Sequence, residues 1–190
     1  MLNSSYRKKD ISELVTLAQK DDNKAIEALI KATQKHIFAT LSYLMSNTSK
    51  IPDLTQNILI KMIQKIKTLK DPEKFKPWLN KIISNSYYDE LRKEKAYCEC
   101  ISLDKDECKH IIDLKTAPPI EKCATSELDK LIKDFIVQLP TQFKIAIILR
   151  EFAGLSYQEI ANITNVEIGT VKSRISRARN ILQNQLRHCI

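Results

Sequence analysis

Glycine is almost absent from this sequence, which has two glycines in 190 residues. Sheets, tight hairpins and glycine-rich phosphate loops usually need more, so the scarcity favours an all-α fold. The three histidines are scattered, and no His-x-x-x-His or carboxylate constellation has useful spacing. We therefore expect a protein that is not an enzyme and carries no cofactor.

Long apolar runs are missing as well. The longest strong one covers residues 145–149, far short of the roughly 20 residues that a membrane-spanning helix needs. The first ten residues are polar and lack the apolar region of a secretion signal. These absences predict a cytoplasmic protein without membrane insertion.

Five cysteines in a cytosolic chain argue against a disulfide framework. Cys98, Cys100, Cys108 and His110 lie close enough in sequence to supply four ligands for a tetrahedral zinc ion. The Cys-x-Cys spacing is tighter than usual, however, and no knuckle glycine frames it. We interpret these residues as incidental thiols and expect no metal, with zinc binding and redox sensing as the alternatives.

Positive charge is concentrated in two blocks of the chain. The net charge is +8, made up of +7 in residues 1–95, −2 in residues 96–126 and +3 in residues 127–190. From Gly169 onward there are five cations and no carboxylate. Two basic blocks joined by an acidic one favour two surfaces for a polyanion, although solubility alone is an alternative for the first block.

Apolar residues recur at helical spacing in both basic blocks. Stripes over residues 26–44 and 54–69 predict helices with one buried face, the second with Asp53 as its cap. A third helix is predicted at about 77–95, after a turn at Asp71-Pro72. Periodicity is lost over 96–126 and returns at 128. We therefore expect two small helical domains, 1–95 and 127–190, joined by a flexible linker, 96–126.

The stretch "GLSYQEIANITNVEIGTVKSRISRAR" has the order of a helix-turn-helix. Gly154 suits the left-handed end of the preceding helix. Ser156 and Glu159 form the pattern of a capping box that opens a short helix. Asn165 lies where a tight turn needs a positive φ, which asparagine tolerates.

The second helix of this motif has two unlike faces. Val171, Ile175, Ala178 and Leu182 fall on one narrow stripe, which predicts a buried face. Short polar side chains and arginines lie opposite, where they can reach base edges in a major groove, and flanking cations can meet phosphates. The predicted duplex-binding residues are Thr170, Lys172, Ser173, Arg174, Ser176, Arg177 and Arg179. The alternative is a basic helix that docks on an acidic protein.

The chain resembles bacterial RNA polymerase sigma factors of the extracytoplasmic-function class. "LPTQFKIAIILREFAGLSYQEIANITNVEIGTVKSRISRARNIL" resembles their region four. "DLTQNILIKMIQKI" and "FKPWLNKIISNSYYDELRKEK" resemble two parts of their region two. The resemblance covers roughly residues 10–95 and 125–187. The chain departs from the family pattern at Asn57, Asn165 and Glu167.

The resemblance implies a protein that binds core RNA polymerase and brings it to chosen promoters. Region four would read the minus-thirty-five element as duplex, and region two would hold the melted minus-ten strand. Asp53 and Gln56 are carried over as contacts to core polymerase. The family also implies promoter DNA and an anti-sigma factor as partners, and a monomer when free.

Aromatic residues lie among lysines in the region-two block, which suits single-stranded DNA because bases stack on rings while cations neutralise phosphates. The residues predicted to hold the minus-ten strand are Lys74, Phe75, Trp78, Asn85, Tyr88 and Arg92. The competing interpretations are a core position for Trp78 and Tyr87, helix capping for Asp53 and simple solvation for Gln56.

Two other classes of protein remain open at this stage. A conventional helix-turn-helix regulator would bind duplex DNA as a dimer without polymerase, but the basic first block with its aromatic residues is unlike a dimerisation or ligand domain. A pure protein-interaction module is disfavoured by the strongly cationic last helix.

Overall fold

The computed structural model of the protein describes residues 10–101 and 127–187, which form helices and no strand. Short 3-10 turns connect some of the helices of the first block: η2 (Thr48–Lys50), η3 (Ile66–Thr68) and η4 (Pro72–Lys74). The helices, in chain order, are α1 (Ile11–Ala18), α2 (Asn23–Leu44), α3 (Ile51–Lys65), α4 (Phe75–Ile101), α5 (Glu127–Gln138), α6 (Thr141–Glu151), α7 (Tyr157–Thr164) and α8 (Ile168–Arg187). The all-α prediction is confirmed.

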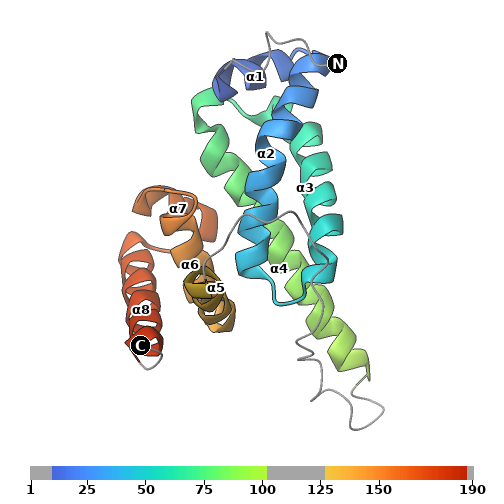
Figure 1. The fold of residues 1–190 in the computed structure, drawn as a ribbon. Coiled ribbons are helices and arrows are strands. Elements are labelled where there is room, and N and C mark those ends of the chain that lie inside the picture. Colours follow the sequence, from blue (N-terminus) through green and yellow to red (C-terminus); the bar gives the residue numbers. More distant parts are fainter. Residues whose placement is uncertain (1–9, 102–126, 188–190) are drawn as a thin grey trace.

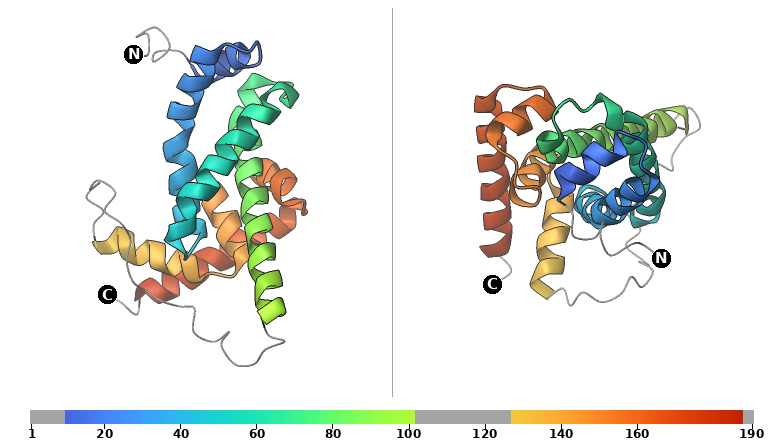
Figure 2. Two further views of the ribbon diagram at one scale, coloured as in Figure 1. Left: turned by 90° about the vertical axis from the view of Figure 1, so that its right-hand side faces the viewer. Right: turned by 90° about the horizontal axis from the view of Figure 1, so that it is seen from above.

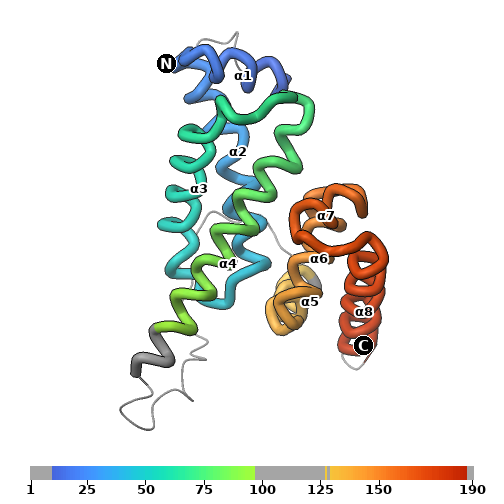
Figure 3. The backbone as a smooth tube through the Cα atoms, turned by 180° about the vertical axis from the view of Figure 1, so that it is seen from behind, coloured from blue at the N-terminus to red at the C-terminus, as the bar shows by residue number. Residues whose placement is uncertain are grey.

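Helices α2, α3 and α4 run side by side, and α1 crosses one end of them (Figures 1 and 3). Their facing sides bury Ile37, Ile58 and Ile83, each with at most 1% of its surface exposed. The α2 helix begins where the Asp22 carboxylate accepts hydrogen bonds from two backbone N–H groups of its first turn. Such a cap satisfies donors that have no partner inside the helix.

The start of α3 differs from the prediction. Asp53 is not the cap: α3 begins at Ile51, and Asp53 is an exposed residue of its first turn, where a carboxylate opposes the helix dipole. The cap position is held by Lys50, whose ammonium donates to Glu90 and to Glu94, each at 3.0 Å. These bonds tie the beginning of α3 to α4.

The third predicted helix is longer than expected at both ends. Asp71 caps the 3-10 turn Pro72–Lys74 through the Glu73 N–H, and α4 continues directly from Phe75 to Ile101. The helix therefore passes the boundary expected at residue 95, because polar side chains such as Lys95 and Glu94 are compatible with a solvated helix that lacks an apolar stripe.

The second block surrounds α6, whose residues 145–149 are all buried. Helices α7 and α8 pack against it, and α5 packs against α8 (Figure 1). Pro140 occupies the position before the first residue of α6, and its carbonyl accepts from the N–H groups of Phe143 and Lys144.

The two blocks pack against each other in a closed arrangement. Helix α7 lies against α4, and α5 and α6 lie against the end of α2 (Figure 2). The rings of Tyr43 and Phe152 have centroids 4.1 Å apart across this contact. The ammonium of Lys144 donates to the carbonyl of Leu44 at 3.3 Å. This packing could not be predicted from the sequence.

Candidate nucleic-acid interface

The helix-turn-helix is held by local hydrogen bonds that the sequence predicted. The backbone N–H and the hydroxyl of Ser156 each lie 2.7 Å from the Glu159 carboxylate, and the Glu159 N–H donates back to the Ser156 hydroxyl. Gly154 has a φ of 65°, and Asn165 has φ 54° and ψ 49°. The capping box and both left-handed positions are therefore confirmed, and they set the angle at which α8 leaves α7.

Helix α8 buries one face and exposes the other. Val171, Ile175 and Ala178 are buried against the block, with Leu182 half-buried behind them. Of the residues predicted to bind duplex DNA, five are exposed: Lys172, Ser173, Ser176, Arg177 and Arg179. The remaining two, Thr170 and Arg174, are half-buried. The predicted reading face is thus largely at the surface.

Arginine side chains on neighbouring elements hold the motif in place. Arg150 of α6 donates to the carbonyl of Leu155 at 2.8 Å, and its guanidinium lies 4.7 Å from the ring centroid of Tyr157 at the start of α7. Arg179 is not free in this structure, because it forms an ion pair with Glu151. The contacts of Arg150 and Arg179 could not be predicted from the sequence, because both depend on how α6 packs beneath the helix-turn-helix.

Helix α4 and the turn before it carry the predicted strand-binding residues. Trp78, Asn85, Tyr88 and Arg92 are separated by seven, three and four positions, so they share one face of α4. Asn85 and Arg92 are exposed, as is Lys74 in the preceding turn, whereas Trp78 and Tyr88 are half-buried. This surface combines rings, an amide and cations, the groups that stack bases and neutralise phosphates.

Phe75 lies apart from this surface. Its side chain is 3% exposed and belongs to the core, with its ring centroid 5.8 Å from that of Trp78. In this structure Phe75 supports Trp78 from beneath and presents no ring to a base, which corrects the predicted direct contact. The repeat Phe75, Leu79, Ile82 is an apolar stripe and was the signal for a core position. Tyr87 is also core, as the competing interpretation had it.

Tyr87 and Tyr88 of α4 both have raised pKa values. Burial raises the pKa of the Tyr88 hydroxyl, and the positive charge of Arg174 on α8 opposes that rise. Burial also raises the pKa of Tyr87, against a lowering by a hydrogen bond with the Thr141 side chain at the start of α6. Tyr87 therefore faces the start of α6 in the second block.

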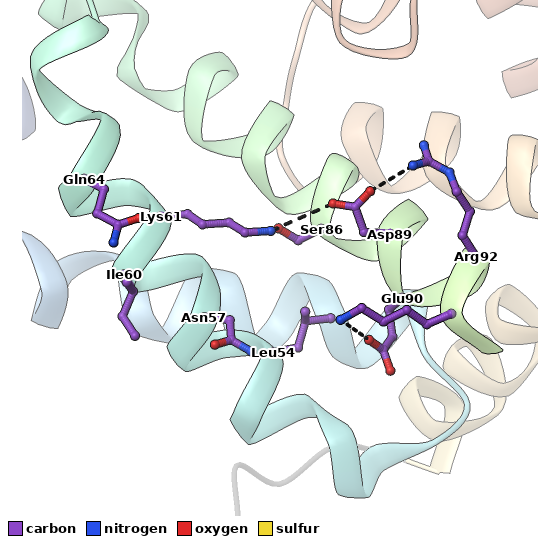
Figure 4. A pocket seen from close by; sticks show the side chains of 10 residues that line it. Leu54, Asn57, Ile60, Lys61, Gln64, Ser86, Asp89, Glu90 and Arg92 are labelled. Carbon is purple, nitrogen blue, oxygen red and sulfur yellow. Dashed lines mark hydrogen bonds and ion pairs between the residues drawn. The ribbon is translucent and has the colours of Figure 1, made fainter. Parts of the chain in front are cut away.

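Asp53 and Gln56, the predicted polymerase contacts, are exposed on α3. Beside them an open groove of about 650 Å³ runs between α3 and α4 (Figure 4). Its α3 wall includes Asn57 and Ile60, and Ile60 is an exposed apolar side chain (45%).

The α4 wall of the groove is charged and internally paired. Lys61 of α3 donates to Ser86 at 3.1 Å and lies 3.9 Å from the Asp89 carboxylate, which also accepts from Arg92 at 3.0 Å (Figure 4). Arg92 therefore joins the groove to the face of α4 that carries the predicted strand-binding residues. Among described residues, no cluster of three His, Cys, Asp or Glu side chains could hold a metal. The side chains of Cys98, Cys100, Cys108 and His110 lie outside the described part of the chain.

Comparison with known families supports both blocks separately. Residues 29–97 match the family described as Sigma-70 region 2, and residues 129–182 match Sigma-70, region 4. The ECF RNA polymerase sigma-E factor of Haemophilus influenzae is 33% identical over 179 residues, which span 91% of this chain and 93% of that protein. The Escherichia coli K12 protein of the same name is 31% identical over 182 residues, with 93% and 94% coverage.

Solved structures give the same picture for the fold. A sigma factor RpoE from Bartonella quintana, solved with the anti-sigma factor NepR, superposes with a TM-score of 0.72 at 29% identity, covering 86% of this chain and 98% of that one. CnrH, solved with the cytosolic domain of CnrY, superposes with a TM-score of 0.63 at 19% identity, a likeness of fold alone. Among the described helices, none combines the length and apolar composition that crossing a membrane requires.

Proposed function

The chain belongs to the extracytoplasmic-function (ECF) class of RNA polymerase sigma factors, and from that premise we propose that it binds core RNA polymerase and directs initiation at specific promoters. The observation that carries the proposal is the capped helix-turn-helix, whose last helix buries an apolar stripe and presents cations with no acid among them. The first block, with its own basic, aromatic surface, fits the strand-melting half of that function.

Residues 127–190 read the minus-thirty-five element as duplex. Helix α8 enters the major groove with Ser173, Ser176 and Arg177 directed at base edges, while Lys172 and Arg179 meet phosphates. Thr170 and Arg174 lie at the edge of this face, where they are half-buried in the closed arrangement. Each cation that neutralises a phosphate steepens the salt dependence of binding by roughly one unit of slope.

Residues 1–95 hold the melted minus-ten strand on α4. Trp78 and Tyr88 supply stacking surfaces, Asn85 supplies an amide for a base edge, and Lys74 and Arg92 neutralise phosphates. The strand therefore crosses the exposed face of α4 rather than the core side where Phe75 lies. Residues 96–126 connect the two DNA-binding blocks.

Core RNA polymerase binds the exposed face of α3. Asp53 and Gln56 are separated by three positions, so they share a helical face, and Ile60 continues it one turn further along. An apolar side chain flanked by a carboxylate and an amide gives both burial and directional bonds to a partner helix. We place the protein in the cytoplasm with the polymerase, as a monomer when free, with an anti-sigma factor as its regulator and no enzymatic activity or cofactor of its own.

In vitro transcription tests the proposal. Sigma-free core polymerase, the purified chain and a pool of genomic promoter fragments should give discrete start sites, and these should disappear with Arg174→Ala/Arg177→Ala. A matched control, Lys20→Ala/Lys24→Ala, removes two exposed cations near the other end of the molecule and should leave initiation intact. No initiation, together with tight binding of the chain alone to specific duplex DNA, would instead identify a conventional helix-turn-helix regulator.

A further inference from the structure

Lys144 is a buried lysine at the contact between the two blocks. It lies on α6 with 6% of its surface exposed, and its ammonium donates to the carbonyl of Leu44 at the last residue of α2. Among the described residues no carboxylate pairs with Lys144. Burial lowers the pKa of the Lys144 ammonium, and no opposing charge offsets the effect.

The buried ammonium of Lys144 makes the closed arrangement less stable than it would be if apolar contacts alone held the two blocks together. An ammonium has three N–H donors, and a single carbonyl satisfies one of them. Burying a charge costs the free energy of its hydration. Only well-placed hydrogen bonds or an ion pair offset that cost. Because Leu44 belongs to the other block, separating the blocks returns the Lys144 ammonium to water, so the cost is tied to closure.

The proposed function requires the two blocks to separate. The inference about Lys144 rests on the proposed function for this step. The positions in their names set the minus-thirty-five and minus-ten elements about 25 base pairs apart, which is roughly 85 Å of duplex at about 3.4 Å per base pair. In the closed arrangement α7 of the helix-turn-helix packs against α4, so the two surfaces cannot reach both elements at once. The 25 residues of 102–126 are long enough to span about 80–90 Å when extended.

We propose that Lys144 is a built-in weak point of the closed arrangement, which keeps the packing of the two blocks reversible. The apolar contact between Tyr43 and Phe152 favours closure, and the buried ammonium beside it opposes closure. The balance lets polymerase and promoter open the chain with the binding free energy that they supply. Removing the charge while keeping the shape would shift the free protein toward the closed state.

Small-angle X-ray scattering on the full chain, alone in solution, tests this directly. Lys144→Met replaces the ammonium by an apolar side chain of similar length and should reduce the largest dimension of the protein relative to wild type. Promoter-dependent transcription should fall by about tenfold, because closed molecules do not engage both elements. Lys130→Met is the matched control: it removes the same charge from an exposed position on α5 and should change neither measurement.

A second variant shows whether Lys144→Met lowers transcription through closure of the two blocks or through loss of a direct contact made by Lys144. Phe152→Ala removes an exposed ring (43%) from the interface, should enlarge the molecule, and, combined with Lys144→Met, should restore transcription. A Lys144→Met protein as extended as wild type, or one that loses transcription without compacting, would overturn the inference. If wild type itself fails to initiate transcription, the proposed function is wrong, whereas the scattering comparison still decides the role of Lys144.

Discussion

Arg179 of α8 forms an ion pair with Glu151, the last residue of α6 and 28 positions earlier in the chain. Both side chains are about half exposed, so the pair contributes little to stability, on the order of 0–1 kcal/mol. The ion pair matters for DNA binding, because a guanidinium engaged by a carboxylate is less available to a phosphate.

Glu151→Gln should therefore strengthen binding to duplex minus-thirty-five DNA. The change removes a negative charge beside the proposed phosphate-binding edge and releases Arg179, so the slope of log affinity against log salt should steepen by up to about one unit. Fluorescence anisotropy of a labelled duplex at several salt concentrations measures both effects. Glu127→Gln removes the same charge from an exposed site on α5 and serves as control. Weaker binding by Glu151→Gln would mean that Glu151 instead orients Arg179 toward the DNA.

Ser156→Ala should destabilise the protein without touching the reading face. The substitution removes the hydroxyl of the capping box, which costs about 1 kcal/mol and lowers the melting temperature by roughly 2–4 °C. Ser176→Ala is the reciprocal control: Ser176 is exposed in the middle of α8, so its loss should weaken DNA binding at unchanged melting temperature. Calorimetry and anisotropy on both variants would show whether capping and recognition separate in this way.

Asn165 should tolerate glycine and reject β-branched residues. Its backbone is left-handed, a conformation that glycine adopts freely and that costs other residues roughly 1–2 kcal/mol. Asn165→Gly should leave the free energy of unfolding unchanged or slightly increased, whereas Asn165→Val should reduce it. Denaturant titrations compare the two variants. Equal stability of the two would show that the turn relaxes to another conformation.

The helix-turn-helix could be predicted in detail because its determinants are local. Ser156, Glu159 and Asn165 act on backbone groups within a few residues, and the stripe on α8 follows from helical spacing alone. Family resemblance then extended the prediction to the first block. The ends of the helices could be predicted less accurately. The residues around Asp53 favour it as a cap, but α3 begins two residues before Asp53, at Ile51.

The contacts between the blocks could not be predicted in the same way. Tyr43 and Phe152, or Lys144 and Leu44, are brought together by docking of elements that the sequence places far apart. Lys144 stands in an otherwise apolar stretch and reads as the solvated side of an amphipathic helix. Nothing in that stretch reveals that a second block covers this side of α6 and buries the lysine.

His36 makes the stability of the first block depend on pH. Burial holds the pKa of His36 below its ordinary value of about 6.5, with the charge of Lys76 adding to the effect and the contact to Asn80 opposing it. The Nε2 atom of His36 lies 3.4 Å from the Asn80 amide oxygen, and Asn80 is fully buried, with its amide nitrogen donating to the Lys76 carbonyl. The folded protein thus holds a neutral imidazole between α2 and α4.

The unfolded chain binds a proton at His36 more readily than the folded one, so stability should fall as pH drops from about 6.5 toward the lower pKa of the folded state. The loss amounts to about 1.4 kcal/mol for each unit by which the two pKa values differ. Urea unfolding at pH 7.5, 6.0 and 5.0 measures it, and His36→Gln should flatten the dependence in that window. His188→Gln, near the C-terminus, is the control and should keep the slope of wild type. A His36→Gln protein with an unchanged slope would assign the pH dependence to other groups.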